Sequence, residues 1–285
     1  MKFYKYTGLG NDFVFVDGKE AQQLLSAKEP LNIAEVARRI CHRRFGVGAD
    51  GLVLLLPSEK ADVQMRIWNA DGSEAEMCGN ASRCVALHWK TQGFTNQPQV
   101  VLDTLAGLIY TEMIDATAGL VRVNMGCPRL KRAQIPMTGA PEDAAVAFAL
   151  EAAGQKFTGT AVSMGNPHVV IFVEDISQVP LEVWGPQLEK HPFFPQKTNV
   201  EFVQVLDAHT VRMRVWERGA GVTMACGTGA CATAVAAVLN KKTEPEVTVK
   251  LDGGNLQIAW PKREQIFMTG PARLVYTGEW PEMKL

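Results

Sequence analysis

The stretch RIWNADGSEAEMCGN at residues 66–80 returns as RVWERGAGVTMACGT at residues 214–228. The two copies are offset by 148 positions, and each contains a cysteine followed by a glycine, at Cys78 and at Cys226. A repeat of this period is too long for a solenoid and indicates two homologous domains. We therefore expect two related halves, each with one cysteine in an equivalent place.

Each cysteine is followed by a segment with helical character, at residues 79–90 and 227–239. The second segment is apolar nearly all round, which is typical of a helix in a domain interior. The sequence predicts an α+β fold of two pseudo-symmetric domains, each a curved mixed or antiparallel sheet wrapped around one central helix. We expect residues 1–120 to form the N-terminal domain, joined by the last strand at 272–285. Residues 121–271 are expected to form the C-terminal domain, with the active site in the cleft between the two.

Hydrophobic periodicity places the remaining elements. In the first half it predicts a helix over 31–44 and strands at 3–17, 52–56, 62–68, 100–103, 108–114 and 120–125, the last three as an antiparallel meander. In the second half it predicts strands at 169–173, 200–206, 210–216, 247–251, 255–260 and 273–277.

The composition narrows the class of protein. Of the 285 residues, 47% are hydrophobic and 21% charged, which is ordinary for a soluble globular protein. A formal net charge of −1 gives no electrostatic footprint for nucleic acid. The N-terminus has no apolar leader, and the longest aliphatic run, Leu52–Leu56, is far short of a membrane span. We expect a cytoplasmic protein with reduced thiols and neither nucleic acid nor membrane as a partner.

The repeated cysteines suggest acid/base chemistry on a small molecule. Backbone N–H groups and the dipole at a helix start favour an anion, so they should lower the pKa of Cys78 and Cys226 from about 8.5 toward neutrality. The same N–H groups can hold a substrate carboxylate. Two such groups on opposite sides of one molecule could remove a proton from one face and return a proton to the other. The sequence thus indicates inversion of a stereocentre.

Two other uses of the cysteines stay open at this point. A metal-stabilised interaction module would need ligands, but Cys78 with Cys84 and Cys226 with Cys231 lack the C-x2-C spacing of a zinc ribbon. A protein that binds amino acids without turnover would not need a second cysteine.

Three glycines, Gly46, Gly48 and Gly51, match the dinucleotide fingerprint literally. That motif must follow a strand and open a helix, whereas here a predicted helix precedes it and a strand follows. No phosphate-binding GxxxxGK[ST] loop is present either. The sequence therefore predicts no cofactor and no metal.

Five strings together closely resemble the diaminopimelate epimerase family. They are GLGNDF at 8–13, NADGSEAEMCGNASRC at 69–84, SMGNPH at 163–168, ERGAGVTMACGTGACA at 217–232 and MTGPA at 268–272. The resemblance covers nearly the whole chain. It implies a cofactor-independent isomerase that interconverts LL- and meso-diaminopimelate, a small amino-acid substrate, on the route to lysine and peptidoglycan. Some relatives dimerise, so the resemblance leaves a homodimer open.

The resemblance also implies roles for residues. Cys78 and Cys226 would be the thiolate base and the thiol acid, exchanging roles with direction, and His168 and Glu217 would assist them. The implied substrate contacts are Asn11, Asn69, Gly79, Asn80, Asn166, Asn199, Glu217, Arg218, Gly227 and Thr228. Arg218 and the asparagines would hold the distal amino-acid end, since Arg is the usual bidentate partner of a carboxylate.

The chain departs from the family pattern at two places. Ala81-Ser82 stands where many members have Gly-Ala or Gly-Ile, and Gly51 stands where some carry a glutamine that contacts substrate. Both changes leave side-chain specificity open. Since proline and hydroxyproline epimerases and a histidine racemase share the fold, the nearest alternative is a racemase or epimerase of another amino acid.

Overall fold

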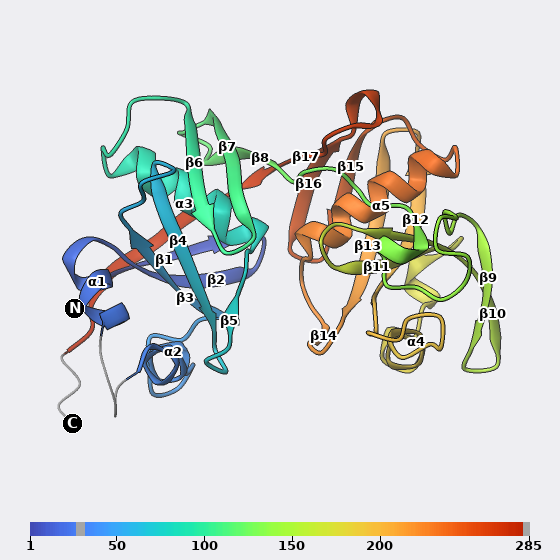
Figure 1. Cartoon of the computed structure of the whole chain (residues 1–285), viewed down its shortest axis with the longest axis horizontal. Coiled ribbons are helices and arrows are strands. Elements are labelled where there is room, and N and C mark those ends of the chain that lie inside the picture. Colours follow the sequence, from blue (N-terminus) through green and yellow to red (C-terminus); the bar gives the residue numbers. More distant parts are fainter. Residues whose placement is uncertain (27–31, 282–285) are drawn as a thin grey trace. The chain divides into compact units, whose positions relative to one another are not determined.

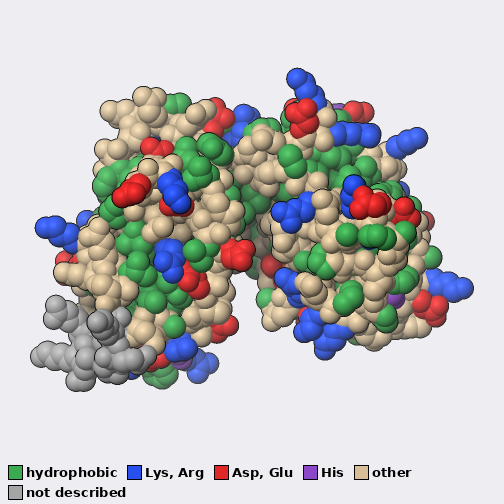
Figure 2. Space-filling view, in the orientation of Figure 1, with side chains coloured by type: hydrophobic (Ala, Val, Ile, Leu, Met, Phe, Trp, Pro, Cys, Tyr) green, Lys and Arg blue, Asp and Glu red, His purple; other side chains and the backbone are tan. Residues whose placement is uncertain are grey.

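The computed structural model describes residues 1–26 and 32–281. They form two compact units, the first made of Met1–Val123 with the chain from Gly270 onward, and the second of Asn124–Thr269 (Figure 1). On the face shown in Figure 2, side chains of both charge signs are interspersed on each unit, in keeping with a net charge near zero. No helix in the described part of the chain is long and apolar enough to cross a membrane.

The first unit is a mixed sheet with the strand order β18-β1-β2-β3-β4-β6-β7-β8. The pairs β2/β3 and β4/β6 are parallel, the other pairs are antiparallel, and the short β5 also pairs with β4. The helix α3 packs against β1, β6, β7 and β18. The bounds are β1 Lys2–Gly8, β2 Asn11–Val16, α1 Gly18–Ser26, α2 Ile33–Cys41, β3 Gly51–Leu56, β4 Val63–Asn69, β5 Glu74–Ala75, α3 Gly79–Thr91, β6 Gln99–Thr104, β7 Gly107–Asp115, β8 Leu120–Asn124 and β18 Arg273–Glu279.

The second unit repeats this topology, with the strand order β9-β10-β11-β12-β13-β15-β16-β17. Here β11/β12 and β13/β15 are the parallel pairs, and the short β14 pairs with β13. The bounds are η1 Arg132–Gln134, β9 Phe148–Ala152, β10 Gln155–Ser163, β11 Pro167–Phe172, η2 Ile176–Gln178, α4 Leu181–Glu189, β12 Asn199–Asp207, β13 Thr210–Glu217, β14 Gly221–Val222, α5 Gly227–Leu239, β15 Glu246–Leu251, β16 Gly254–Ala259, η3 Pro261–Arg263 and β17 Phe267–Pro271.

The registers of the parallel pairs make the two units comparable residue by residue. Phe13 of β2 pairs with Gly51 of β3, and His168 of β11 pairs with Asn199 of β12. These are equivalent positions in the two sheets. His168 therefore occupies the place that Phe13 has in the first unit, and Asn199 occupies the place of Gly51.

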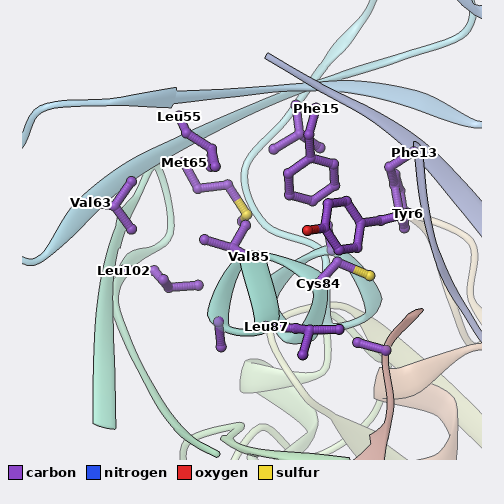
Figure 3. Close-up of a cluster of buried hydrophobic side chains, with 14 of the residues drawn as sticks. Tyr6, Phe13, Phe15, Leu55, Val63, Met65, Cys84, Val85, Leu87 and Leu102 are labelled. Carbon is purple, nitrogen blue, oxygen red and sulfur yellow. The ribbon is translucent and has the colours of Figure 1, made fainter. Parts of the chain in front are cut away.

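A buried helix lies at the centre of each core, as predicted. In the first unit, residues 79–88 of α3 are buried, and Figure 3 shows Cys84 and Val85 of this helix facing Tyr6 and Phe15 of the sheet. In the second unit, residues 229–238 of α5 are buried. Burial of this many apolar side chains is the main stabilising contribution of each unit. The predicted α+β class is confirmed.

The predicted helix at 79–90 is α3, and the predicted meander is the antiparallel β6, β7 and β8. The helix predicted over 31–44 is shorter: α2 ends at Cys41 because His42 is extended, with φ −63° and ψ 119°. Its predicted first residue, Leu31, lies outside the described residues, as does the end of the predicted last strand at 282–285.

The sequence does not predict α1, α4, β9 or β10. In α4 the pair Gly185-Pro186 has the composition of a helix breaker. The structure gives the reason for Gly185: a Cβ there would lie 2.6 Å from Cγ of Trp216. The close approach of this helix to β13 requires a glycine, and a local sequence pattern cannot show that.

Candidate active site

Each repeated cysteine is the residue immediately before a buried helix. Cys78 precedes α3 with φ −141° and ψ 118°, and Cys226 precedes α5 with φ −121° and ψ 111°. Both are extended, so the glycine that follows begins the helix. The first backbone N–H groups of a helix have no intrahelical acceptor. The pairs Gly79-Asn80 and Gly227-Thr228 therefore offer N–H donors beside each cysteine, where an anion is favoured.

Cys226 is buried, and its sulfur is held by the first turn of α5. Sγ accepts a hydrogen bond from the backbone N–H of Gly229 at 3.3 Å and lies 3.5 Å from Oγ1 of Thr228. Burial nevertheless raises the pKa of Cys226 well above its usual value, and the negative charges of Glu217 and Glu201 add to the rise. The predicted lowering of this pKa is wrong, because loss of hydration outweighs the helix start.

Glu217 is the last residue of β13 and is a neighbour of Cys226. Its Oε1 accepts a hydrogen bond from the Thr223 hydroxyl. Burial raises the pKa of Glu217, and hydrogen bonds with Thr223 and Cys226 oppose the rise. A carboxyl with a raised pKa beside a thiol with a raised pKa is an arrangement in which one proton can be exchanged between the two groups.

His168 is fully buried, and hydrogen bonds occupy both of its ring nitrogens. Nδ1 lies 2.6 Å from Oε1 of Glu201, and Nε2 lies 3.0 Å from Oδ1 of Asn166. Asn166 in turn donates from Nδ2 to Oγ1 of Thr228 at 3.3 Å. The structure thus brings together His168, Asn166, Thr228 and Cys226, all singled out from the sequence.

Glu201 is the member of this group that the sequence analysis missed. It is fully buried in β12, within the run Asn199–Val203 of which every residue is buried. The signal that could have revealed it is a charged residue directly between two apolar ones, Val200 and Phe202, in a predicted strand, since a buried charge needs a partner.

The first unit holds its equivalent residues differently. Nδ2 of Asn80 donates to Oδ1 of Asn11, and Nδ2 of Asn11 donates to Oδ2 of Asp50 at 3.1 Å. The fully buried Arg83 donates to Oδ1 of Asn80 at 2.8 Å and to the carbonyl of Pro271 at 3.2 Å. Asn11 and Asn80 are thus in contact, as their counterparts Asn166 and Thr228 are in the second unit.

Cys78 is half-buried against the core of the first unit. Its sulfur does not cap α3, unlike that of Cys226. Its carbonyl accepts from the backbone N–H of Ser82 at 2.9 Å and from the Ser82 hydroxyl at 3.0 Å. The two cysteines therefore share a backbone position but have different sulfur surroundings.

The remaining predicted contacts are split between the units. Asn199 is buried, donates to the carbonyl of Pro167 at 2.8 Å and accepts from the backbone N–H of Arg218 at 2.9 Å. The exposed Arg218 side chain donates to the carbonyl of Gln196 at 3.0 Å. Asn69, in the first unit, is exposed, and its Nδ2 donates to the Ser73 hydroxyl at 3.0 Å. Within the second unit, then, Asn199 positions the backbone of Arg218.

Two further cysteines lie within the central helices. Cys84 and Cys231 are buried inside α3 and α5, and burial raises the pKa of Cys84 to about 12. Within residues 1–26 and 32–281, no group of three or more His, Cys, Asp or Glu side chains has an arrangement suited to a metal ion.

Two solved structures of low sequence identity share the fold of this chain. A probable proline racemase from Agrobacterium radiobacter has a TM-score of 0.69 at 16% identity, over 98% of this chain and 92% of that one. A hydroxyproline epimerase from Agrobacterium vitis has a TM-score of 0.67 at 17% identity, over 98% and 91%. The fold is shared with these proteins.

Comparison of sequences is more specific. Residues 3–131 and 160–275 match the family described as diaminopimelate epimerase. The diaminopimelate epimerase of Pelotomaculum thermopropionicum is 52% identical over 283 residues, covering 99% of each chain. That of Synechococcus sp. strain JA-3-3Ab is 50% identical over 289 residues, again covering 99% of each. The chain belongs to the diaminopimelate epimerase family of isomerases, and the resemblance found in the motifs is confirmed.

Proposed function

We propose that this chain interconverts LL- and meso-diaminopimelate, in lysine biosynthesis, with Cys78 and Cys226 as the two acid/base groups. The observation that carries the proposal is the placement of both cysteines at equivalent helix starts in a chain that is 52% identical to a relative of that name over its full length. Duplicated domains supply two acid/base groups, and an epimerisation needs one for each face of the stereocentre.

The reaction requires a single exchange of protons. One cysteine, as thiolate, takes the α-proton, so that the C–H bond breaks, an S–H bond forms and the electron pair stays on the α-carbon. The thiol of the other cysteine then gives its proton to the opposite face of that carbon. The configuration is inverted, the two cysteines have exchanged protonation states, and no external oxidant or cofactor enters the balance.

The carbanion is the costly species, because an α-proton is a very weak acid and a thiolate is a modest base. We propose that Gly79-Asn80 and Gly227-Thr228 direct their backbone N–H groups at the α-carboxylate. Prearranged donors of this kind stabilise developing negative charge by several kcal/mol. This use of the helix starts explains why a glycine follows each cysteine: it leaves room for the carboxylate to approach the backbone.

Glu217 and His168 are proposed to serve Cys226. Because the pKa of Cys226 is raised by burial and by the Glu217 charge, this cysteine rests as a thiol. It becomes a base only when its proton has a place to go, and the hydrogen-bonded Glu217 provides that place. His168 acts from the other side, through Asn166 and Thr228.

Substrate choice is proposed to depend on Arg218. Its guanidinium is exposed beside the first turn after β13, while Asn199 fixes its backbone. A guanidinium is suited to the second carboxylate of diaminopimelate. Asn69 and Asn11 are proposed to complete the polar contacts from the first unit. A racemase of a neutral or cationic amino acid would have no use for Arg218, which makes that alternative weaker.

The location and assembly belong to the same proposal. Paired thiols that act as acid and base must remain reduced, which supports the cytoplasm as the place of action. A homodimer is proposed on the family resemblance alone, and sedimentation of the purified protein tests it.

The deciding experiment follows the α-proton by NMR. LL-diaminopimelate in D2O with reductant should give deuterated meso product with the wild type and none with Cys78→Ala or Cys226→Ala. Cys127→Ala, which removes an exposed thiol, is the matched control and should react normally. Exchange on glutamate, lysine or histidine but not on diaminopimelate would overturn the substrate, and epimerisation by a single-cysteine variant at the wild-type rate would overturn the two-thiol mechanism.

A further inference from the structure

The buried carboxylate of Glu201 has no counterpart in the first unit. Counting two residues along β12 from Asn199, and two along β3 from Gly51, pairs Glu201 with Val53, which is also fully buried. In the first unit, the sheet position equivalent to Glu201 is therefore occupied by a buried apolar side chain. A buried charge costs several kcal/mol of desolvation unless it is well paired, so the fold alone does not explain Glu201.

Helix α5, which lies beside Glu201, has a glycine at the point where it meets the carboxylate. A Cβ at Gly229 would lie 2.7 Å from Oε1 of Glu201 and 3.2 Å from Sγ of Cys226. The repeat offset aligns Gly229 with the buried Ala81 of the first unit. One unit thus combines Glu201 with a glycine where the other combines Val53 with an alanine, and the glycine is what admits a carboxylate against the start of α5.

The contacts of Glu201 point to His168. Oε1 is 2.6 Å from Nδ1, while Oε2 has no hydrogen-bond partner among the described residues. A carboxylate only accepts, so Nδ1 carries a proton. The other groups that titrate near this ring are Glu217 on β13 and Cys226 on α5.

The direction of the remaining hydrogen bonds depends on Nε2 of His168. A doubly protonated ring donates from Nε2 to Oδ1 of Asn166, which lies 3.0 Å away. Nδ2 of Asn166 then donates to Oγ1 of Thr228. The hydroxyl proton of Thr228 is left for Sγ of Cys226, 3.5 Å away. A neutral ring would accept at Nε2, the Asn166 amide would turn over, and its Oδ1 would take the Thr228 proton away from the sulfur.

We propose that Glu201 is a positioning residue for Cys226: it keeps the His168 ring doubly protonated, and through Asn166 this leaves the Thr228 hydroxyl to donate to the sulfur. The thiolate of Cys226 then has two donors, Thr228 and the backbone N–H of Gly229. The first unit lacks this chain of contacts, since Phe13 and Val53 stand at the equivalent positions. The proposal rests on the role given above to Cys226.

Two measurements that do not depend on turnover test it. The first is ¹⁵N NMR of the His168 ring near pH 7. The ring should be doubly protonated in the wild type and neutral in Glu201→Gln, which keeps the shape but removes the charge. The second is the pH midpoint of Cys226 alkylation by iodoacetamide, followed on its own peptide by mass spectrometry. Glu201→Gln removes the negative charge of Glu201, which raises the pKa of Cys226, and with it the positive charge of the His168 ring, so these two charge effects oppose each other. Loss of a donor to the thiolate should then raise that midpoint by about one pH unit.

Two further variants keep the test decisive. Glu201→Val with Gly229→Ala reproduces the packing of the first unit, and should fold and show the same rise in midpoint if the single Glu201→Gln variant folds poorly. Thr228→Val removes the last donor directly, and adding Glu201→Gln to it should raise the midpoint no further. Non-additive effects of two substitutions on the midpoint are expected when the two residues belong to one series of hydrogen bonds.

The outcomes separate the possibilities. A neutral His168 ring in the wild type, an unchanged Cys226 midpoint in Glu201→Gln, or fully additive effects of Glu201→Gln and Thr228→Val would each overturn the positioning role. These results would leave the two-thiol epimerisation standing, because that is judged by deuterium exchange in the cysteine variants. Conversely, failure of epimerisation in the wild type would not alter the ring and thiol titrations.

Discussion

Glu217 ends strand β13 at the position where Asn69 ends strand β4. The two residues are as far apart along the chain as the repeated cysteines are. A carboxyl group therefore stands in the second unit where the first unit has a neutral amide. This carboxyl group forms a hydrogen bond with Cys226, and its negative charge raises the pKa of that thiol. Duplication kept the backbone of the two cysteine sites and changed their electrostatics.

The first prediction concerns that carboxyl. Glu217→Gln should lower kcat by about 10²- to 10⁴-fold, the usual contribution of a positioned acid or base. The same change should lower the pH midpoint of Cys226 alkylation, because a neighbouring negative charge is removed. Steady-state kinetics and peptide mapping measure the two effects. Glu246→Gln, on the exposed start of β15, is the control. Unchanged turnover in Glu217→Gln would contradict the role.

The sequence allowed prediction of those parts of the site that the repeat carries. Cys78 and Cys226 appear at a constant offset in matching strings, so a local pattern identifies both. Glu201 has no such pattern, because the first unit has the unrelated apolar residue Val53 at its position. The repeat does not identify His168 either, since Phe13 stands at its position, and only the family resemblance predicted that residue. The raised pKa of Cys226 could not be predicted from the sequence either, since it depends on burial by residues that are distant in the sequence. Similarly, α4 could not be predicted from its own residues, because its Gly185 is required by the neighbouring Trp216.

The second prediction concerns the buried arginine of the first unit. Arg83→Met should destabilise the protein by about 2–4 kcal/mol, because it leaves the acceptors on Asn80 and Pro271 buried without their donor. It should also raise KM, since Arg83 orients Asn80 at the start of α3. Urea unfolding and kinetics measure these effects.

Its control is Arg122→Met, which breaks an exposed ion pair with Glu112 and should change stability by less than about 1 kcal/mol. Equal stability of the two variants would show that Arg83 is not a structural anchor.

The third prediction concerns the contact of α4 with β13. Gly185→Ala places a Cβ 2.6 Å from Cγ of Trp216, so the helix must shift, at a cost of about 1–3 kcal/mol. Thermal unfolding measures the loss. Val183→Ala, an exposed change on the same helix, should alter stability by no more than about 0.5 kcal/mol. A stable Gly185→Ala variant would mean that the helix has room to move.

The fourth prediction concerns the effect of the buried Cys84 thiol on the free energy of unfolding at alkaline pH. Burial raises its pKa to about 12, whereas an unfolded thiol ionises near about 8.5. A raised folded-state pKa means that the folded protein keeps a proton which the unfolded chain releases. The stabilisation that this raised pKa gives to the folded protein is therefore complete below pH ~8.5. It is lost as pH rises toward about 12, and the free energy of unfolding falls by up to ~1.4 kcal/mol per pH unit.

Cys84→Ala removes this contribution. The variant should be less stable at neutral pH, because it creates a cavity beside α3. Its free energy of unfolding should nevertheless fall less steeply with pH between about 9 and 11 than that of the wild type. Urea unfolding in the presence of reductant at several pH values gives both slopes. Cys127→Ala, which removes an exposed thiol, should keep the wild-type slope. Parallel slopes for Cys84→Ala and the wild type would mean that the buried thiol ionises as readily in the folded protein as in the unfolded chain.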